Sequence, residues 1–169
     1  MTKALTRSSI AATAASLVLG CLLFLAPQQP THAQSEDSAS PNSLQGTWWI
    51  TVTQYDCATG TTRPSFTSLG AFHRGGTMSE TTGNPAFQPG QRTSGYGTWS
   101  GGDGDTYTST DESFIVFSAG PFTQGTQRIN HSIRVDGNQF SDNATVQFFD
   151  MQGRLLVSGC ARAVGTRLQ

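Results

Sequence analysis

The 169-residue sequence is almost free of lysine: its single lysine is Lys3, and every other basic residue is an arginine. Charged residues make up only 12% of the chain, and its formal net charge is −1. No block of basic residues is present to attract nucleic-acid phosphates or an anionic membrane surface. The composition therefore argues against nucleic acid as a partner.

Motifs of the common catalytic and cofactor sites are also missing. The chain contains no G-x-S-x-G, H-E-x-x-H or Walker sequence, and no C-x-x-C pair. Asp103-Gly104-Asp105 resembles part of a calcium loop but lacks the remaining spacing and the terminal glutamate, so it indicates a tight turn. We therefore predict no metal site and no cofactor, and we assign no catalytic residue.

The N-terminus has the pattern of a secretory signal peptide. Lys3 and Arg7 precede an uncharged apolar segment over 10–26, and Thr31-His32-Ala33 is a weak cleavage signal. The apolar core is short for a membrane span. We predict that residues 1–33 are removed, that the protein is exported to the periplasm or the extracellular space, and that no stable membrane insertion follows cleavage.

A lipoprotein anchored through Cys21 is the alternative to a cleaved signal peptide. The four apolar residues over 22–25 continue past this cysteine, whereas a lipidated cysteine should end the apolar core, so cleavage near Ala33 is favoured. Residues 34–43 are rich in small and polar residues and predict a flexible leader. The folded domain is then expected over 44–169.

Cys57 and Cys160 are the two cysteines that remain after cleavage. An even pair in an exported domain is the usual setting for a disulfide, so we predict a bond between them.

The rest of the chain predicts an all-β fold. It has 19 glycines, frequent turn residues and alternating apolar and polar positions, with no long helical pattern. Eight strands are expected, over 46–56, 65–74, 77–83, 93–100, 105–118, 126–135, 139–149 and 154–167.

The turns predict the register of the last three strands. A turn at Gly137-Asn138 places Val135 opposite Phe140 and His131 opposite Ala144, and a turn over 150–153 places Ala144 opposite Gly159. One face then carries a mostly apolar set: Ile129, Ile133, Val135, Phe140, Val146, Phe148, Leu155 and Val157.

The expected disulfide also predicts how the sheet closes. If Cys57 and Cys160 lie directly opposite each other on antiparallel strands, Ile50 faces Arg167 and the first strand neighbours the last. The result is a closed eight-stranded antiparallel up-and-down barrel, which has no free edges. A two-sheet β-sandwich is the alternative.

Gly46-Thr47-Trp48 at the start of the first strand, with Arg167 at the end of the last, resembles the lipocalin and wider calycin pattern. That resemblance implies that Trp48 lies across the closed end of the barrel and that Arg167 packs on its ring. It also implies binding of small apolar ligands, although other calycin-like barrels inhibit enzymes or catalyse reactions. The second motif of the family, a Thr-Asp-Tyr-like run, is missing.

His131 is the first candidate for a ligand contact, because the register turns it toward the inside. Its neighbours Ala144 and Gly159 are small and leave space beside a polar group, as ligand pockets do. A buried histidine satisfied by a hydroxyl, with aromatic side chains filling the barrel, is the alternative. Phe87 and Phe122 lie in the longer loops and are the candidates at the mouth.

Three functions follow from this sequence. The leading one is a non-catalytic barrel that binds a small apolar or amphipathic ligand, which enters at the end away from Trp48. The second is a small barrel enzyme of isomerase or cyclase type that uses His73, Glu80 or His131, with His73 and Glu80 as a pair on one face. The third is an interaction or structural protein with a filled barrel.

Overall fold

The computed structural model describes residues 43–101, 104–117 and 123–169. The predicted signal peptide, Cys21, residues 34–42 of the leader and Phe122 lie outside the described residues. Within the described part of the chain, no helix is long and apolar enough to span a membrane.

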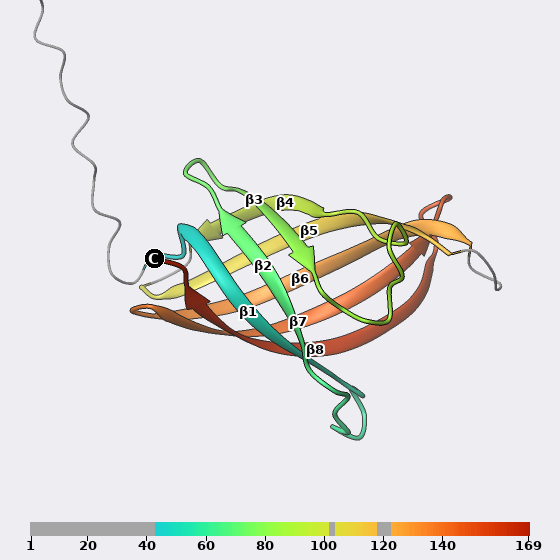
Figure 1. Cartoon of the computed structure of the whole chain (residues 1–169), viewed down its shortest axis with the longest axis horizontal. Coiled ribbons are helices and arrows are strands. Elements are labelled where there is room, and N and C mark those ends of the chain that lie inside the picture. Colours follow the sequence, from blue (N-terminus) through green and yellow to red (C-terminus); the bar gives the residue numbers. More distant parts are fainter. Residues whose placement is uncertain (1–42, 102–103, 118–122) are drawn as a thin grey trace, which may run out of the picture. The chain divides into compact units, whose positions relative to one another are not determined.

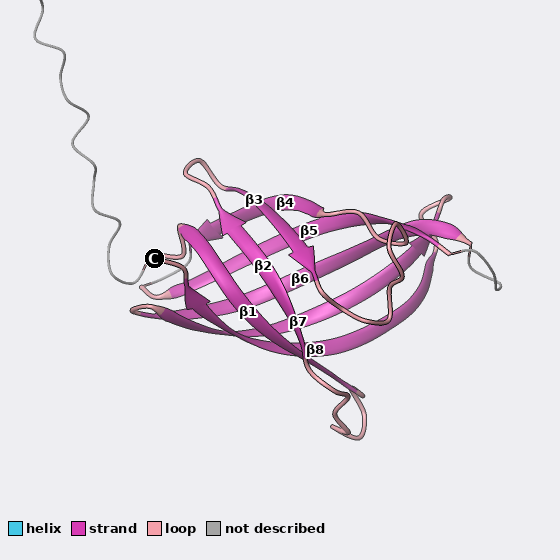
Figure 2. Ribbon diagram, viewed as in Figure 1, coloured by secondary structure: helices cyan, strands magenta, loops and turns pink. Residues whose placement is uncertain are grey.

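Eight strands make up the domain (Figures 1 and 2). Each begins and ends within two residues of the range predicted from the sequence. The strands are β1 (Gly46–Tyr55), β2 (Phe66–Phe72), β3 (Thr77–Thr82), β4 (Gly95–Gly101), β5 (Thr106–Val116), β6 (Gln124–Asp136), β7 (Gln139–Asp150) and β8 (Leu155–Arg167).

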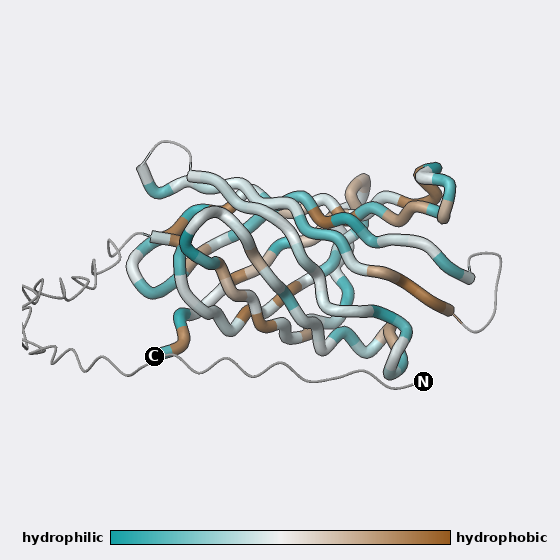
Figure 3. The backbone as a smooth tube through the Cα atoms, turned by 90° about the horizontal axis from the view of Figure 1, so that it is seen from above, coloured by the Kyte–Doolittle hydropathy of each residue, from teal (hydrophilic) through white to brown (hydrophobic). Residues whose placement is uncertain are grey.

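The sheet is a closed antiparallel barrel in which every strand pairs with its neighbours in the chain and β1 pairs with β8. This confirms the predicted up-and-down barrel over the sandwich alternative. Along each strand, successive side chains point alternately into the barrel and out of it. Hydrophilic and hydrophobic residues are accordingly interspersed along the chain (Figure 3).

The predicted register of the β6–β7 hairpin is confirmed, with Val135 opposite Phe140 and His131 opposite Ala144. The predicted β7–β8 register is wrong by two residues, since Ala144 faces Ala161 and not Gly159. One residue of the shift arises at the turn, where Phe149 faces Leu155 and not Arg154, and a β-bulge between Phe148 and Phe149 adds the second. Because the shift is even, the same side chains still face inward.

The predicted pairing of the first and last strands is also displaced by two residues. Ile50 faces Gly165, and Arg167 lies directly opposite Trp48. The disulfide between Cys57 and Cys160 is present, as predicted, with Cα atoms 5.4 Å apart. Cys57 follows the end of β1. The strand partner of Cys160 is Tyr55, so the disulfide runs diagonally between residues that are not directly opposite, and this explains the two-residue error in the predicted register.

Two members of the predicted apolar face remain in solvent: Leu155 is 48% exposed and Val157 is 58% exposed. The pairing of β8 with β1 begins only at Cys160. The first residues of β8 therefore extend past the end of β1, where no neighbouring strand on that side can cover them.

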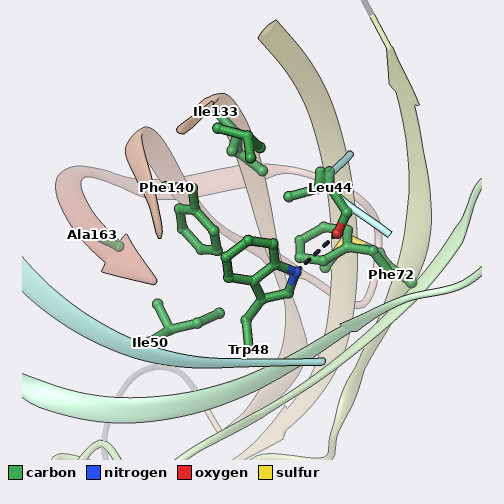
Figure 4. Close-up of a cluster of buried hydrophobic side chains, with 9 residues drawn as sticks. Leu44, Trp48, Ile50, Phe72, Ile133, Phe140 and Ala163 are labelled. Carbon is green, nitrogen blue, oxygen red and sulfur yellow. Dashed lines mark hydrogen bonds between the residues drawn. The ribbon is translucent and has the colours of Figure 1, made fainter. Parts of the chain in front are cut away.

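Trp48 lies in the cluster of buried apolar side chains at the end of the barrel where β1 begins (Figure 4). Its ring is fully buried, and its indole N–H donates to the carbonyl oxygen of Leu44 at 2.8 Å. Phe140 packs on it edge to face, with ring centroids 5.0 Å apart. The guanidinium of Arg167 lies 4.2 Å from the ring centroid. Trp49, the next residue along β1, is exposed.

Candidate functional site

A cavity of ≈ 70 Å³ lies inside the barrel, next to the apolar cluster around Trp48. Small and apolar side chains form most of its wall: Ile50, Val52, Phe66, Gly70, Phe72, Met78, Phe87, Ile129, Ile133, Phe140, Ala144, Val146, Ala161 and Ala163. Polar side chains form the remainder: Gln54, Ser68, Glu80, Thr82, Asn84, Arg92, Gln127, His131 and Asp142.

The charged members come from four strands and one loop. Strand alternation turns Glu80 of β3, Asp111 of β5, His131 of β6 and Asp142 of β7 inward, while Arg92 enters from the segment between β3 and β4. We call these five residues the polar cluster. Asp111 is not part of the cavity lining but lies beside two residues that are, His131 and Arg92.

His131 bridges two carboxylates. Its Nδ1 lies 2.6 Å from Asp142 Oδ2, and its Nε2 lies 3.2 Å from Asp111 Oδ1. An ionised carboxylate only accepts hydrogen bonds, so both ring nitrogens must carry a proton to satisfy both contacts. The backbone N–H of Ser132 also donates to Asp142, which fixes that carboxylate. The ring is therefore held as an imidazolium.

The same surroundings act on the titration of His131. Burial opposes its protonation, but the hydrogen bonds to Asp111 and Asp142 and their charges outweigh burial and raise the pKa of His131 to about 10. At neutral pH the imidazolium has no free nitrogen lone pair with which to remove a proton. His131 thus serves as a fixed cation in this arrangement and not as a general base.

Arg92 ties the β3–β4 segment to the interior. Its side chain is only 3% exposed, and it donates from Nη2 to Glu80 Oε2 at 2.8 Å and from Nε to Gln127 Oε1 at 2.6 Å. Burial raises the pKa of the Glu80 carboxyl; the charge of Arg92 opposes this rise, and that of Asp111 adds to it. The Glu80 carboxyl consequently takes up a proton at a higher pH than an exposed glutamate does.

Three buried polar atoms in this region have no hydrogen-bond partner among the described residues: Ser109 Oγ, Asp111 Oδ2 and Ser113 Oγ. All three side chains alternate along β5 and point inward. Asp111 Oδ2 is 4.0 Å from Arg92 Nη2, which is too far for a hydrogen bond. The two serine hydroxyls can donate as well as accept, whereas a carboxylate oxygen only accepts, so Asp111 Oδ2 is a buried acceptor without a donor.

The segment between β3 and β4 covers the end of the barrel opposite Trp48 (Figure 1). Phe87 stacks on Phe117 with ring centroids 6.1 Å apart. Backbone hydrogen bonds join Thr93 to Phe114 and Val116 to Gln91, which hold the segment along the end of β5. Since Phe87 and Arg92 both line the cavity, this segment forms its outer wall.

The predicted pairing of His73 with Glu80 is wrong. Phe72 faces Met78 and Gly70 faces Glu80, which places Glu80 on the inner side of β3. His73 follows the end of β2, is exposed, and has its Nε2 3.5 Å from Ser79 Oγ. Strand alternation therefore separates the two side chains, one inside and one outside.

Of the predicted ligand contacts, His131, Ala144 and Phe87 line the cavity. Gly159 is opposite Val146 and outside the cavity lining, because of the two-residue shift of β8. Among the described residues, no group of three or more His, Cys, Asp or Glu side chains is placed to hold a metal ion.

Several members of the polar cluster were missed from the sequence. The predicted register already placed Asp142 opposite the inward Ile133, and alternation along β5 would have turned Asp111 inward as well. The inward position of Asp111 and Asp142 on their strands was therefore the sequence signal that could have identified them. Arg92 lies in a loop, for which no periodicity predicts the direction of a side chain.

Comparison with known proteins adds no relative: no family model matches this chain, and neither the curated proteins nor the solved structures contain a match.

Proposed function

We propose that this protein is an exported, non-catalytic barrel that binds a small amphipathic molecule in its central cavity. The observation that carries the proposal is the cavity itself, whose mostly apolar wall faces a buried polar cluster inside one closed barrel. An apolar pocket with a few convergent polar groups is the usual form of a small-molecule site.

The cavity volume sets the size of the ligand body. A buried water needs about 10–15 Å³ of such volume, so ≈ 70 Å³ has room for roughly five waters. A ligand body of about that many non-hydrogen atoms is expected, with any longer tail extending past Phe87. This space favours a binding barrel over the filled structural barrel that the sequence left open.

The resemblance to lipocalins and calycins supports the same function. The stacking of Arg167 on Trp48 has the form that this pattern implied, and a plugged base with long connections at the other end suits a ligand carrier. We accordingly place ligand entry beside Phe87, at the end away from Trp48.

An enzyme of isomerase or cyclase type has less support. Two carboxylates occupy the ring nitrogens of His131, and His73 is on the outside of the barrel. The general base that the enzyme hypothesis needs is then left to Glu80, which is paired with Arg92.

The test uses 1-butanol, a probe of matching size. Ligand-observed NMR measures whether it binds saturably to the purified mature protein. Ala144 lines the cavity, so Ala144→Leu fills it and should weaken 1-butanol binding at least tenfold. Ala71→Leu is the matched control, since Ala71 is on the outer side of β2. Equal binding by the Ala144→Leu variant, or no binding by the wild type, would remove the proposal.

Native mass spectrometry of protein taken from its natural host gives the complementary measurement. A co-purifying small molecule that is absent from the Ala144→Leu variant would identify the ligand. Fractionation of the same cells tests export, which requires the mature chain to begin after Ala33 and to lie outside the cytoplasm.

A further inference from the structure

The charges of the polar cluster do not balance. Arg92 and the imidazolium of His131 face three carboxylates, those of Glu80, Asp111 and Asp142. With all five groups ionised, the cluster carries an excess of one negative charge. This excess is buried, because the five side chains are between 0% and 18% exposed.

Most hydrogen-bond donors of the two cations are already committed. Both ring N–H groups of His131 point at carboxylates. The guanidinium of Arg92 donates to Glu80, to Gln127 and to the carbonyl oxygen of Thr93. Both cations are thus already paired with carboxylates, and an entering carboxylate or phosphate would meet an existing excess of negative charge.

One acceptor of the cluster, in contrast, is left without a donor. The Asp111 side chain is fully buried, and its Oδ2 points into the cluster, 4.0 Å from Arg92, without a hydrogen-bond partner. This orphaned oxygen is independent of the charge count and indicates the same deficit, since buried acceptors are ordinarily satisfied.

We propose that the ligand head group is a cation that donates hydrogen bonds, a small primary amine with an apolar body, held beside Glu80 and Asp142. The inference rests on the proposed binding function and specifies its ligand class. Glu80 and Asp142 are the two carboxylates of the cluster that line the cavity, and the apolar wall receives the alkyl or aryl part.

The amine offsets a cost that the empty barrel carries. Burying an ammonium group is unfavourable unless it is paired and hydrogen-bonded; here Glu80 and Asp142 can pair with it, and it supplies the missing positive charge. Without it, burial raises the pKa of Glu80, so a proton can take the place of the cation. Arg92 and Asp111 are the charged groups that act on Glu80.

The experiment compares n-butylamine, 1-butanol and butyrate, which share an alkyl chain and differ in head group. Their affinities for the mature wild-type protein are measured near neutral pH by ligand-observed NMR. We expect n-butylamine to bind at least tenfold more tightly than butyrate, with 1-butanol between them.

Glu80→Gln removes one buried negative charge with little change in shape. We expect it to lower the affinity for n-butylamine at least tenfold and to leave 1-butanol within about twofold. Glu112→Gln is the matched control, because Glu112 is also paired with an arginine, Arg128, but on the exposed outer face of β5. It should leave all three affinities unchanged.

The possible results separate this inference from the function on which it rests. If 1-butanol or butyrate binds as tightly as n-butylamine, the amine inference is wrong and the binding function stands. If none of the three binds, both are wrong. Should Glu80→Gln fail to fold, the ranking of the three probes on the wild type decides alone.

Discussion

The guanidinium of Arg167, at the end of β8, lies 4.2 Å from the ring centroid of Trp48, at the start of β1. Arg167 also donates to the carbonyl oxygens of Gln45 at 2.5 Å and Ser43 at 2.6 Å. One side chain thus joins the last strand, the first strand and the residues that precede it. These contacts make Arg167 a link across the seam where the barrel closes.

We expect Arg167→Ala to lower the free energy of unfolding by about 2 kcal/mol, since it removes a cation–π contact and leaves two carbonyl groups without this donor. Urea denaturation measures the change. Arg162→Ala, on the exposed outer side of β8, is the control and should change it by less than about 0.5 kcal/mol. Equal effects would show that the Trp48 contact adds nothing.

The second prediction concerns two glycines of β4. A Cβ atom at Gly97 would lie 1.9 Å from the carbonyl oxygen of Thr110, which is backbone and cannot move aside. Gly97→Ala should therefore cost more than about 3 kcal/mol or prevent folding. At Gly101 the nearest atom is the Tyr107 side chain at 3.5 Å, an ordinary contact, so Gly101→Ala should cost under about 1 kcal/mol. Thermal unfolding followed by circular dichroism compares the two variants.

The course of the strands could be predicted from the sequence because each register must keep one side of every strand inside. Val135 opposite Phe140 agrees with that requirement, whereas the closure of β1 on β8 was predicted from the Cys57–Cys160 bond. The two errors in register were both even, since an odd shift would have turned the apolar side chains outward. The total two-residue shift of β8 and the diagonal disulfide leave that alternation unchanged and so give no sequence signal.

The candidate site was less predictable than the fold. His131 was found because a tight turn fixes its strand pairing. Its partner Asp142 was left out of the mostly apolar inner set, and its partner Asp111 was not assigned to a face. Arg92 reaches the cavity from a loop through contacts with Glu80 and Gln127, on two other elements. Such contacts depend on the closed barrel and not on any local pattern of residues.

The third prediction tests the proposed mouth. Phe87 lines the cavity and stacks on Phe117, so Phe87→Ala should raise the dissociation constant of 1-butanol several-fold. Gly104→Asn alters the turn at the Trp48 end and should leave it unchanged, because asparagine tolerates the positive φ of 69° found there. If Gly104→Asn weakens 1-butanol binding more than Phe87→Ala does, the ligand enters at the Trp48 end and the prediction is wrong.

The disulfide gives the fourth prediction. Cys57 and Cys160 are separated by 103 residues, and the chain-entropy model gives about 4–5 kcal/mol for a loop of that length. Replacing both cysteines by alanine should lower the free energy of unfolding by about 2–4 kcal/mol, the usual range for such bonds. Urea denaturation of the double variant and of the oxidised wild type measures the difference. Free thiols at both positions in protein from its natural compartment would contradict the bond.

The last prediction follows from the protonation of His131. Its pKa is raised to about 10 in the folded protein, against about 6.5 in the unfolded chain, so the folded state holds a proton that the unfolded state releases. This stabilisation is present in full below about pH 6.5 and is lost as the pH rises through 10. Between about pH 7 and 9 the free energy of unfolding should therefore fall by up to about 1.4 kcal/mol per pH unit.

His131→Gln lacks the titrating group, so its unfolding free energy should change less with pH over the same range. The measurement is urea denaturation of both proteins at several pH values. If the variant is too unstable for that comparison, the NMR shift of the wild-type His131 Hε1 replaces it and should stay constant from about pH 6 to 9. A shift that titrates near pH 6.5 would show that Asp111 and Asp142 do not hold the ring as a cation.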